Sequence, residues 1–460
     1  MPRILDKLGL HRPELRAWAM YDWAISAVQT TIMVAVFPIF FIDFAGAEVG
    51  GSVAQQYWAN SNSIGIAIVA LISPILGAIA DYAGAKKKLL GAFMFVGLLA
   101  CAGMFFINRG DITLASVLFI LVSIAAAGAT VFYEALLPHI ASEDETDRVS
   151  TAGYAIGYIG GGVLLAINLL MILKPGLFGL PTGPNLTPDQ ASLPTRLSML
   201  SVAAWWLFFS FPLFRRVSEP PAKLEEDESG RENIVKVAFT RLFETFRELR
   251  GYKQAFLMLV AFLIYNDGIS TIQKMATAYG TELGIARGSL IAAILIVQFV
   301  GIPFTFLFGA LAGKIGAKRS IFLGLLVYAG ISILGYYMKT ATHFYILAGL
   351  VGMVQGGTQA LSRSLFANMI PRHKSGEFFG FYSVFNKFAG IFGPLLFSST
   401  IHATGSSRNA ILSVILFFFI GAAILMFVNV EEGERIARAA EAHTHPKGVA
   451  PQRAPEPVGA

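Results

Sequence analysis

Three polar side chains share one face of a long apolar segment near the start of the chain. Asp22, Ser26 and Gln29 are four and three residues apart, a spacing that aligns side chains along one stripe of an α-helix. The run Trp23–Ile42 that follows contains no charged residue. Because a carboxylate in such a segment is costly to bury and marks a functional position, we predict that the stripe faces a polar cavity. Asp22 would bind a proton or the ammonium group of a solute there.

A second segment repeats this pattern. Tyr265–Gln273 aligns with Tyr21–Gln29 without a gap, which pairs the tyrosines, the serines and the glutamines and sets Asn266 against Asp22. Asp267 follows directly. In transporters built from two related halves, equivalent helices meet at one central site. We therefore expect Asp22 to face Asn266 and Asp267 across a shared polar cavity.

Two lysines stand in apolar segments of the second half of the chain. Lys274 follows Asp267 by seven residues, about two helical turns along the same face, so the two charges are expected at different depths of one aqueous cavity. Lys387 would add a cation to the wall of this cavity. A cavity with both signs of charge suits a zwitterion such as an amino acid, since each end of the solute needs a partner. The alternative for Lys274 is a side chain that extends to the outer membrane surface.

A third polar stripe comprises Gln355, Gln359 and Arg363, which follow one another at intervals of four residues. Arg363 is expected near the inner end of its helix, where a buried cation needs an anionic partner. Three partners remain open: the carboxylate of a solute, Glu134 or Asp267. Glu134 itself lies close to the inner end of another apolar segment, where it either belongs to a gate or is simply solvated.

The composition is that of a membrane protein. Apolar residues make up 55% of the 460 and charged residues only 14%, with a mean hydropathy of +0.63, whereas soluble domains carry about 25% charged residues. The single Cys101 excludes a disulfide within the chain. The seven histidines are scattered, so we expect no metal, no cofactor and no enzyme activity. The net charge of +6 follows membrane topology and does not indicate a nucleic-acid partner.

Twelve segments are long and apolar enough to cross a bilayer, which requires about 20 residues each. They lie near 15–42, 57–80, 89–107, 112–138, 149–173, 197–214, 255–281, 288–313, 319–338, 342–370, 378–401 and 409–430. We therefore predict an all-α membrane protein with 12 transmembrane helices in two pseudo-symmetric six-helix bundles. Its parts are residues 1–214, a cytoplasmic linker at 215–253, residues 254–430, and a largely disordered cytoplasmic tail at 431–460.

Lysine and arginine fall mostly on one side of these spans, at both termini, in the linker and in the loops around 86–88, 314–319 and 372–374. Because positively charged loops stay in the cytoplasm, we expect both termini there and a multi-pass protein of the bacterial inner membrane. Within the linker, residues 231–250 alternate charged and apolar positions at helical spacing. This pattern predicts an amphipathic helix on the inner membrane surface.

The loops after the second and eighth spans share one pattern. The first copy carries Gly77, Asp81, Gly84, Lys86 and Lys87, and the second carries Gly309, Gly313, Gly316, Lys318 and Arg319 in the same spacing. Small residues at helix ends allow two helices and a tight turn to approach closely. The basic pair holds the turn among lipid headgroups, so both loops are expected to act in gating.

This pattern resembles the signature loop of the major facilitator superfamily, G-x-x-x-D-x-x-G-x-K/R-K/R, and the predicted fold is that superfamily's. The resemblance implies that Asp81 meets the N-terminal end of a helix in the opposite half, which would start near Gly376, where the helix dipole favours an anion. Since Gly313 replaces the acid in the second copy, only one such latch is expected. The alternative is that Asp81 merely caps its own helix.

Three longer passages are similar to a narrower group. The runs Trp18–Thr31, Tyr265–Ile272 and Gln355–Tyr382 resemble the "unknown major facilitator" branch, which contains fungal vacuolar amino-acid effluxers linked to autophagy. The resemblance implies a secondary transporter whose cargo is a neutral amino acid. Its partners would be the lipid bilayer, the solute and protons, and it would act as a monomer.

The expected function is proton-linked alternating access, in which two halves rock around a small polar or zwitterionic solute, an amino acid moving outward. The alternative is a nutrient sensor or scaffold of the same fold that signals through the linker helix and the tail without transport. A channel is disfavoured, because paired halves with separate gate loops suit alternating access.

Overall fold

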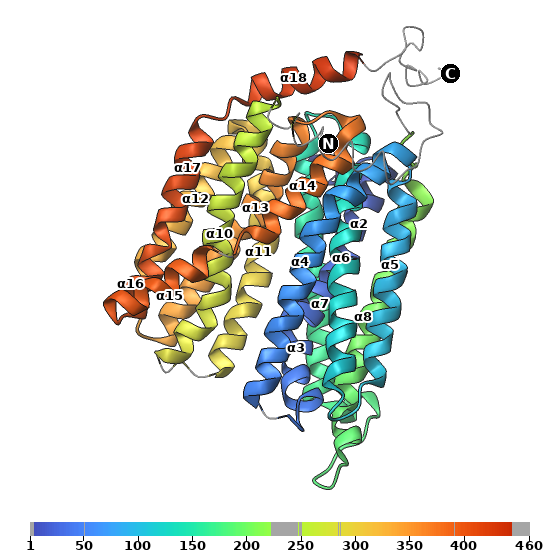
Figure 1. The fold of residues 1–460 in the computed structure, drawn as a ribbon, viewed down its shortest axis with the longest axis vertical. Coiled ribbons are helices and arrows are strands. Elements are labelled where there is room, and N and C mark those ends of the chain that lie inside the picture. The colour runs from blue at the N-terminus through green and yellow to red at the C-terminus, as the bar shows by residue number, and fades with distance from the viewer. Residues whose placement is uncertain are drawn as a thin grey trace.

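The computed structural model describes residues 4–49, 51–221, 247, 251–283, 285, 287–390 and 392–443, and these residues form only helices and connecting loops (Figure 1). The first half contains α1 (Ile4–Lys7), α2 (Pro13–Ala27), η1 (Val28–Ala35), α3 (Phe37–Phe40), η2 (Phe41–Ala45), α4 (Gly51–Ala83), α5 (Lys86–Gly103), η3 (Met104–Phe106), α6 (Ile112–Ile140), α7 (Thr146–Leu173), η4 (Pro175–Phe178) and α8 (Pro188–Arg216).

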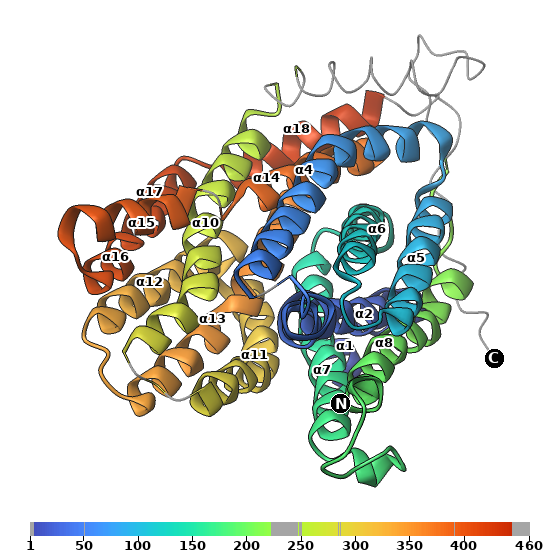
Figure 2. The ribbon, with the colours of Figure 1, turned by 60° about the horizontal axis from the view of Figure 1, so that its bottom comes forward.

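The second half contains α10 (Lys253–Glu282), α11 (Arg287–Ile315), α12 (Ala317–Tyr336), α13 (Ala341–Asn368), η5 (Arg372–Lys374), α14 (Ser375–Phe388), α15 (Phe392–Thr404), α16 (Ser407–Ser413) and α17 (Ile415–Met426). It is followed by α18 (Val430–His443). Figure 2 shows the two halves side by side, with α4 against α14 and α7 against α11 and α13 at their junction. The fold is that of twelve membrane-crossing helices in two bundles.

Eleven helical segments of the described chain are long and apolar enough to cross a membrane. The remaining predicted span, 378–401, is divided between α14 and α15. The sequence explains the division, because Gly390 adopts a φ of 102° that favours glycine and Pro394, in the first turn of α15, has no N–H to donate. The prediction of one continuous helix at this position is therefore wrong.

The first span also departs from the expected regular helix. After Ala27 it continues as π-helical turns at Val28–Ala35 and again at Phe41–Ala45. The hydroxyl of Thr30 donates to carbonyl oxygens of Ser26 at 3.1 Å and Gly161 at 3.2 Å, which draws the helix toward α7. Such π-helical turns occur frequently at functional sites.

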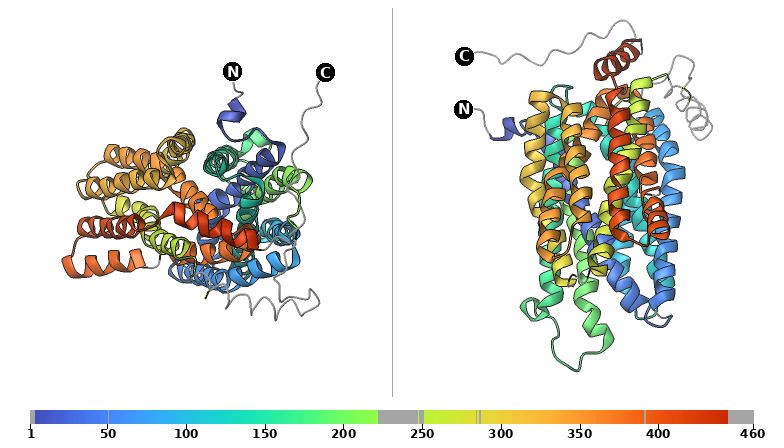
Figure 3. Two further views of the ribbon diagram at one scale, coloured as in Figure 1. Left: turned by 90° about the horizontal axis from the view of Figure 1, so that it is seen from above. Right: turned by 90° about the vertical axis from the view of Figure 1, so that its left-hand side faces the viewer.

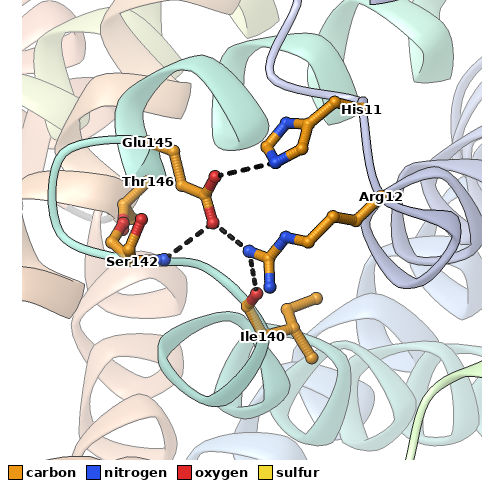
Figure 4. A network of polar contacts seen from close by, with 6 residues as sticks. All are labelled: His11, Arg12, Ile140, Ser142, Glu145 and Thr146. Carbon is orange, nitrogen blue, oxygen red and sulfur yellow. Dashed lines mark hydrogen bonds and ion pairs between the residues drawn. The ribbon is translucent and has the colours of Figure 1, made fainter. Parts of the chain in front are cut away.

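Both terminal helices, α1 and α18, lie at the same end of the molecule, which we call the terminal side (Figures 1 and 3). Figure 4 shows how the start of α2 is fixed there. The guanidinium of Arg12 donates to the carbonyl of Ile140 at 2.7 Å and pairs with Glu145, which also lies 3.7 Å from His11. The loop between α6 and α7 thus anchors the N-terminal segment.

The linker prediction lies outside the described residues: within 231–250, only Arg247 is described. Of the tail, the structure describes residues up to 443, and these belong to α18. Its apolar face packs on the second half, where Gly433 lies against Met369.

Candidate functional site

A cavity of about 930 Å³ lies between the two halves. Its polar lining consists of Ser26, Gln29, Thr30, Tyr154, Tyr158, Gln273, Tyr279, Gln298 and Gln355. Gln29 and Gln273 occupy equivalent positions in the two copies of the repeated motif, so the structure brings this pair of the predicted residues to one cavity. Ser26 and Gln355, also predicted, join them.

The cavity is placed toward one side of the molecule. Tyr279, Met338 and Phe344 line it, and they stand where α10 ends, after α12 and near the start of α13, at the end opposite the terminal side. Toward the terminal side the lining reaches Ser26, Tyr154 and Gly157. These three residues form what we call the floor of the cavity.

An ion pair that joins the two halves lies directly beneath this floor. The carboxylate of Asp22 accepts a hydrogen bond from the hydroxyl of Tyr133 at 2.7 Å, and the same oxygen lies 3.5 Å from a guanidinium nitrogen of Arg363. Asp22 belongs to α2 in the first half and Arg363 to α13 in the second. Contact between the two is close because position 153 is glycine; a Cβ there would lie 2.6 Å from the Asp22 carboxylate.

The rest of the Arg363 side chain is also held by the opposite half. Its Nε donates to the hydroxyl of Ser150 and its Nη2 to the Ser150 carbonyl, both at 2.9 Å. The guanidinium stacks 4.4 Å from the ring centroid of Tyr154 and 4.9 Å from that of Trp18. Only 1% of Arg363 is exposed, so these contacts take the place of the water molecules that would otherwise hydrate the guanidinium.

Among the described groups, Arg363 forms an ion pair with Asp22, a partner that the sequence analysis did not name. The reason is packing: α13 lies against α7, so the side chain crosses the junction instead of entering a cavity. A solute carboxylate as a further partner stays a prediction. Glu134 is buried in α6, on the terminal side of the cavity floor.

Asp267 does not face Asp22. Its carboxylate accepts hydrogen bonds from the backbone N–H groups of Gly390, Phe392 and Gly393 at 2.9, 3.0 and 2.8 Å. It therefore caps the start of α15, where the chain leaves the break after α14 and N–H groups lack helical partners. The expectation that Asp267 lines a solute cavity is replaced by a role in holding this break.

The side chain of Asn266 also contacts residues of its own half. It donates to the side-chain oxygen of Asn386 at 2.9 Å and accepts from Gln359. The hydroxyl of Tyr265 contacts that of Ser362, and the ring of Tyr21 lies tilted against that of Tyr133, with ring centroids 4.9 Å apart. None of Tyr21, Tyr265, Asn266 or Gln359 is among the described residues that line the cavity.

Lys274 lies on α10 and Lys387 on α14, but their side chains fall outside the described parts. Their predicted place in the cavity stays a prediction. The described residues contain no group of three or more potential metal ligands.

On the terminal side, Asp81 lies where α14 begins. One carboxylate oxygen accepts the backbone N–H of Glu377 at 2.8 Å, and the other pairs with Lys86. Gly77 and Gly376 touch backbone to backbone, since a Cβ on Gly77 would lie 2.1 Å from the Gly376 carbonyl oxygen. We call Gly77, Asp81, Gly376 and Glu377 the latch. It joins α4 of one half to α14 of the other.

The two gate loops fix their own halves in the same way. The ammonium of Lys87 donates to the carbonyls of Phe214 and Val217 at the end of α8, at 3.1 and 2.8 Å. In the second loop, Lys318 donates to the carbonyls of Met426 and Val428 at the end of α17, at 2.9 and 2.7 Å. The turn glycines Gly84 and Gly316 have φ of 55° and 87°, Gly309 packs on Thr151, and Arg319 is exposed.

Helix α18 spans the junction outside the membrane helices. Arg438 donates to the carboxylate of Glu143 in the first half, with one contact at 2.9 Å, and this acid raises the pKa of Arg438. In the second half, Glu432 accepts from the side chain of Gln254 and Glu441 from the backbone N–H of Arg372, both at 2.7 Å. The last described helix therefore ties both halves together.

Several residues of the site carry no mark in the sequence. Tyr133, Ser150 and Tyr154 surround the ion pair, yet tyrosine and serine are common in membrane helices. Glycine spacing gives the only signal, because Gly153 and Gly157 are the points where α7 approaches Asp22 and Ser26. A GxxxG run marks close helix contact without naming the partner.

The family model described as "Vacuole effluxer Atg22 like" matches residues 54–438. The chain belongs to this Atg22-like family. An uncharacterized transporter of the major facilitator type, YxiO of Bacillus subtilis, is 38% identical over 424 residues, which cover 92% of this chain and 96% of the relative.

The fungal members of the Atg22-like family are longer. Autophagy-related protein 22 of Yarrowia lipolytica is 26% identical over 320 residues, covering 64% of this chain and 52% of its own, so the chain spans about half its length. Among solved structures, the proton:xylose symporter XylE bound to 6-bromo-6-deoxy-D-glucose has a TM-score of 0.68 at 13% identity, covering 92% and 98% of the two chains.

The transporter FucP in its outward conformation is a second structural neighbour, with a TM-score of 0.65 at 13% identity and coverage of 92% of this chain and 99% of its own. These likenesses establish the fold. The protein is a multi-pass membrane transporter of the major facilitator superfamily.

Proposed function

We propose that this transporter exports a small polar or zwitterionic solute, an amino acid, and that a proton drives the exchange. The observation that carries the proposal is the Asp22–Arg363 pair, which lies beneath the floor of the cavity and joins the two halves. The family description of an effluxer supports the outward direction. The chemistry is transport, and we propose no catalytic role for these side chains.

The Asp22–Arg363 pair offers a mechanism that couples proton binding to the movement of the two halves. While Asp22 is ionised, its carboxylate holds Arg363 across the junction, and Tyr133 keeps the carboxylate oriented. A proton on Asp22 removes the opposite charge, so the attraction that offsets burial of the guanidinium is lost. The halves then separate on the terminal side, so the cavity opens to that side and no longer to the opposite end of the molecule.

We propose that the terminal side is cytoplasmic, in the inner membrane of a bacterium. The excess of lysine and arginine in the termini and in the loops of this side supports that orientation. With the latch and the ion pair in place, the protein would then be in an outward-facing state. The structural neighbour FucP is likewise described in an outward conformation.

Efflux from proteoliposomes tests the proposal. Vesicles loaded with a mixture of radiolabelled amino acids should release one class of them faster when a pH gradient is imposed, and Asp22→Asn should abolish the response to the gradient. If Asp22→Asn and wild type respond alike, Asp22 is not the coupling group. Ligand-induced thermal stabilisation without any flux would instead favour the sensor alternative.

A further inference from the structure

Helix α7 presents one stripe of side chains to α11 and α13 of the second half, which lie beside it in Figure 2. The stripe follows helical spacing and consists of Asp147, Ser150, Thr151, Tyr154 and Tyr158. The first four contact the second half as follows: Asp147 accepts from the hydroxyl of Ser364, Ser150 accepts from Arg363, Thr151 lies against Gly309, and Tyr154 stacks on Arg363. Since α7 starts on the terminal side, these contacts form a series that leads from there to Tyr158.

Tyr158 is the member of the stripe closest to the cavity. Its side chain lines the cavity, as do Leu165 further along α7 and Ile294 on α11. Contact between the halves along α7 and α11 therefore gives way to the cavity at the depth of Tyr158.

The ring of Tyr158 lies against two glycines of the opposite half. A Cβ on Gly301 of α11 would lie 3.3 Å from Cε2 of Tyr158, and its three nearest atoms would all belong to this ring. A Cβ on Gly356 of α13 would lie 2.5 Å from the same carbon. The hydroxyl of Tyr158 also forms a hydrogen bond with the side chain of Gln355. We call Gly301 and Gly356 the socket.

The two helices that form the socket are fixed to each other. The hydroxyl of Thr305 donates to the carbonyl of Gly301 at 2.7 Å, and a Cβ on Gly356 would lie 2.1 Å from that hydroxyl oxygen. One turn further along, a Cβ on Gly352 would lie 2.9 Å from the carbonyl oxygen of Val297. The socket thus belongs to one rigid unit. Glycine presents only backbone there, so a flat ring can tilt against it without side chains that interlock.

The other contacts of the stripe lie at increasing distance from Tyr158. Asp147 precedes it by eleven residues, about 16 Å along a helix. A rigid-body rotation of about 15° displaces a point about 16 Å from its axis by about 4 Å, which is enough to separate Asp147 from Ser364. A contact on the axis itself is kept.

We propose that Tyr158 in its socket is the fulcrum on which α7 turns against α11 and α13, and that this contact is kept whether the terminal side is closed or open. Tyr158 is a positioning residue, because it fixes the depth at which the halves turn. The inference goes beyond the proposed function, since it holds whichever solute or ion is moved.

Spin-label distances between α7 and α11 at three depths test the inference in the intact protein, with Cys101, the single native cysteine, replaced by alanine. The label pairs are Arg148 with Lys314, Ile159 with Phe299, and Leu170 with Ile294. Gly77→Ala, whose methyl group would lie 2.1 Å from the Gly376 carbonyl oxygen, opens the other junction between the halves; Gly309→Ala replaces it if it does not fold.

We expect the sign of the change to reverse at Tyr158. The pair on the terminal side should lengthen by about 4 Å, the pair level with Tyr158 should keep its distance, and the pair beyond it should shorten. Lengthening at all three depths, or a change level with Tyr158 as large as that on the terminal side, overturns the proposal.

Two matched variants of α11 give a second test. Gly309→Ala and Gly301→Ala make the same change eight residues apart, against Thr151 and Tyr158. Both should lower the melting temperature. Gly309→Ala overpacks a contact of the closed terminal side alone, so the fraction of molecules open on that side should rise about fivefold or more. Gly301→Ala overpacks a contact that both states keep and should change this fraction less than about twofold.

An equal rise in both variants would show that Tyr158 is one more contact of the closed side, and a wild-type melting temperature in Gly301→Ala would show that the ring and the socket do not press on each other. Either result overturns the inference. Tyr158→Leu replaces Gly301→Ala if the latter does not fold. Because both tests measure distances and stability, a protein that turns at Tyr158 yet shows no proton-driven export fails the proposed function while the fulcrum stands.

Discussion

Asp22 and Asp267 occur in the two copies of one motif, but they hold different parts of the molecule together. Asp22 pairs with Arg363 of the opposite half, whereas Asp267 caps the start of α15 in its own half. The motif aligns Asp22 with Asn266, and the acid of the second copy stands one residue later. A shift of one helical position turns the side chain by 100°, which explains why one acid reaches across the junction and the other does not.

The gate loops show the same asymmetry. In the first loop, Asp81 engages Lys86, and Lys87 binds the carbonyls after α8. In the second loop, glycine replaces the acid, and Lys318, the counterpart of Lys86, binds the carbonyls after α17. In these loops, the first half thus supplies an acid that contacts the other half, whereas the lysine of the second loop fixes helices of its own half.

The largest expected effect comes from unpairing the buried ions. Asp22→Asn leaves Arg363 without its opposite charge and should cost about 3–5 kcal/mol of stability, because removing one partner of a buried pair strands the other. The double variant Asp22→Asn with Arg363→Met removes both charges and should recover most of this loss. Melting temperatures of the single and double variants in detergent measure the coupling; strictly additive losses would show that the pair is not energetically linked.

A smaller effect is expected in the second copy. Asp267→Asn keeps one acceptor oxygen but loses charge-assisted bonds to the N–H groups of α15, at a cost of about 1.5–3 kcal/mol. The spin-label distance between α4 and α14 should stay as in wild type. Asp22→Asn should lengthen that distance, because it removes the ion pair between the halves. An equal change in both variants would remove the distinction between the two acids.

The latch can be opened without touching a charge. Gly77→Ala places a methyl group 2.1 Å from the Gly376 carbonyl oxygen, so α4 and α14 must move apart, at a cost of about 1–3 kcal/mol. We expect longer spin-label distances between them on the terminal side. Gly313→Ala, which meets no atom within 4 Å, is the matched control. Equal distances in the two variants would show that the contact does not hold the terminal side closed.

The smallest effect concerns α18. Arg438→Glu places an acid beside Glu143 and Glu434 and should lower stability only slightly, because exposed ion pairs contribute little. Protease access to the loop that carries Glu143 should rise. The exchanged pair, Arg438→Glu with Glu143→Arg, should restore protection. Failure of the exchange would show that α18 is held by its apolar face alone.

Much of the fold follows from hydropathy and repetition. Runs of apolar residues identify the spans because a bilayer imposes a minimum helix length, and the two loops repeat with the same glycine spacing, which identifies the halves. The break after Phe388 and the π-helical turns after Ala27 were not predicted. The length of an apolar segment indicates that it crosses the membrane, but it does not indicate the pattern of backbone hydrogen bonds within the helix.

The candidate site was predictable in part. The stripe that begins at Asp22 leads to the cavity through Ser26 and Gln29, since helical spacing fixes which side chains share a face. The partner of Arg363 could not be found this way, because it depends on how α13 packs against α7. A side chain near the junction can contact the opposite half as closely as its own, and a single sequence does not show how the two halves pack.

The position of α18 has a kinetic consequence. If α18 stays with the second half through Gln254, its bond to Glu143 of the first half must break whenever the terminal side opens, although α18 contributes no described residue to the cavity lining. It therefore raises the barrier between the two states without changing what the cavity recognises. A chain shortened before Val430 should keep its preference among solutes and exchange states faster, so turnover and selectivity can be adjusted separately in this transporter.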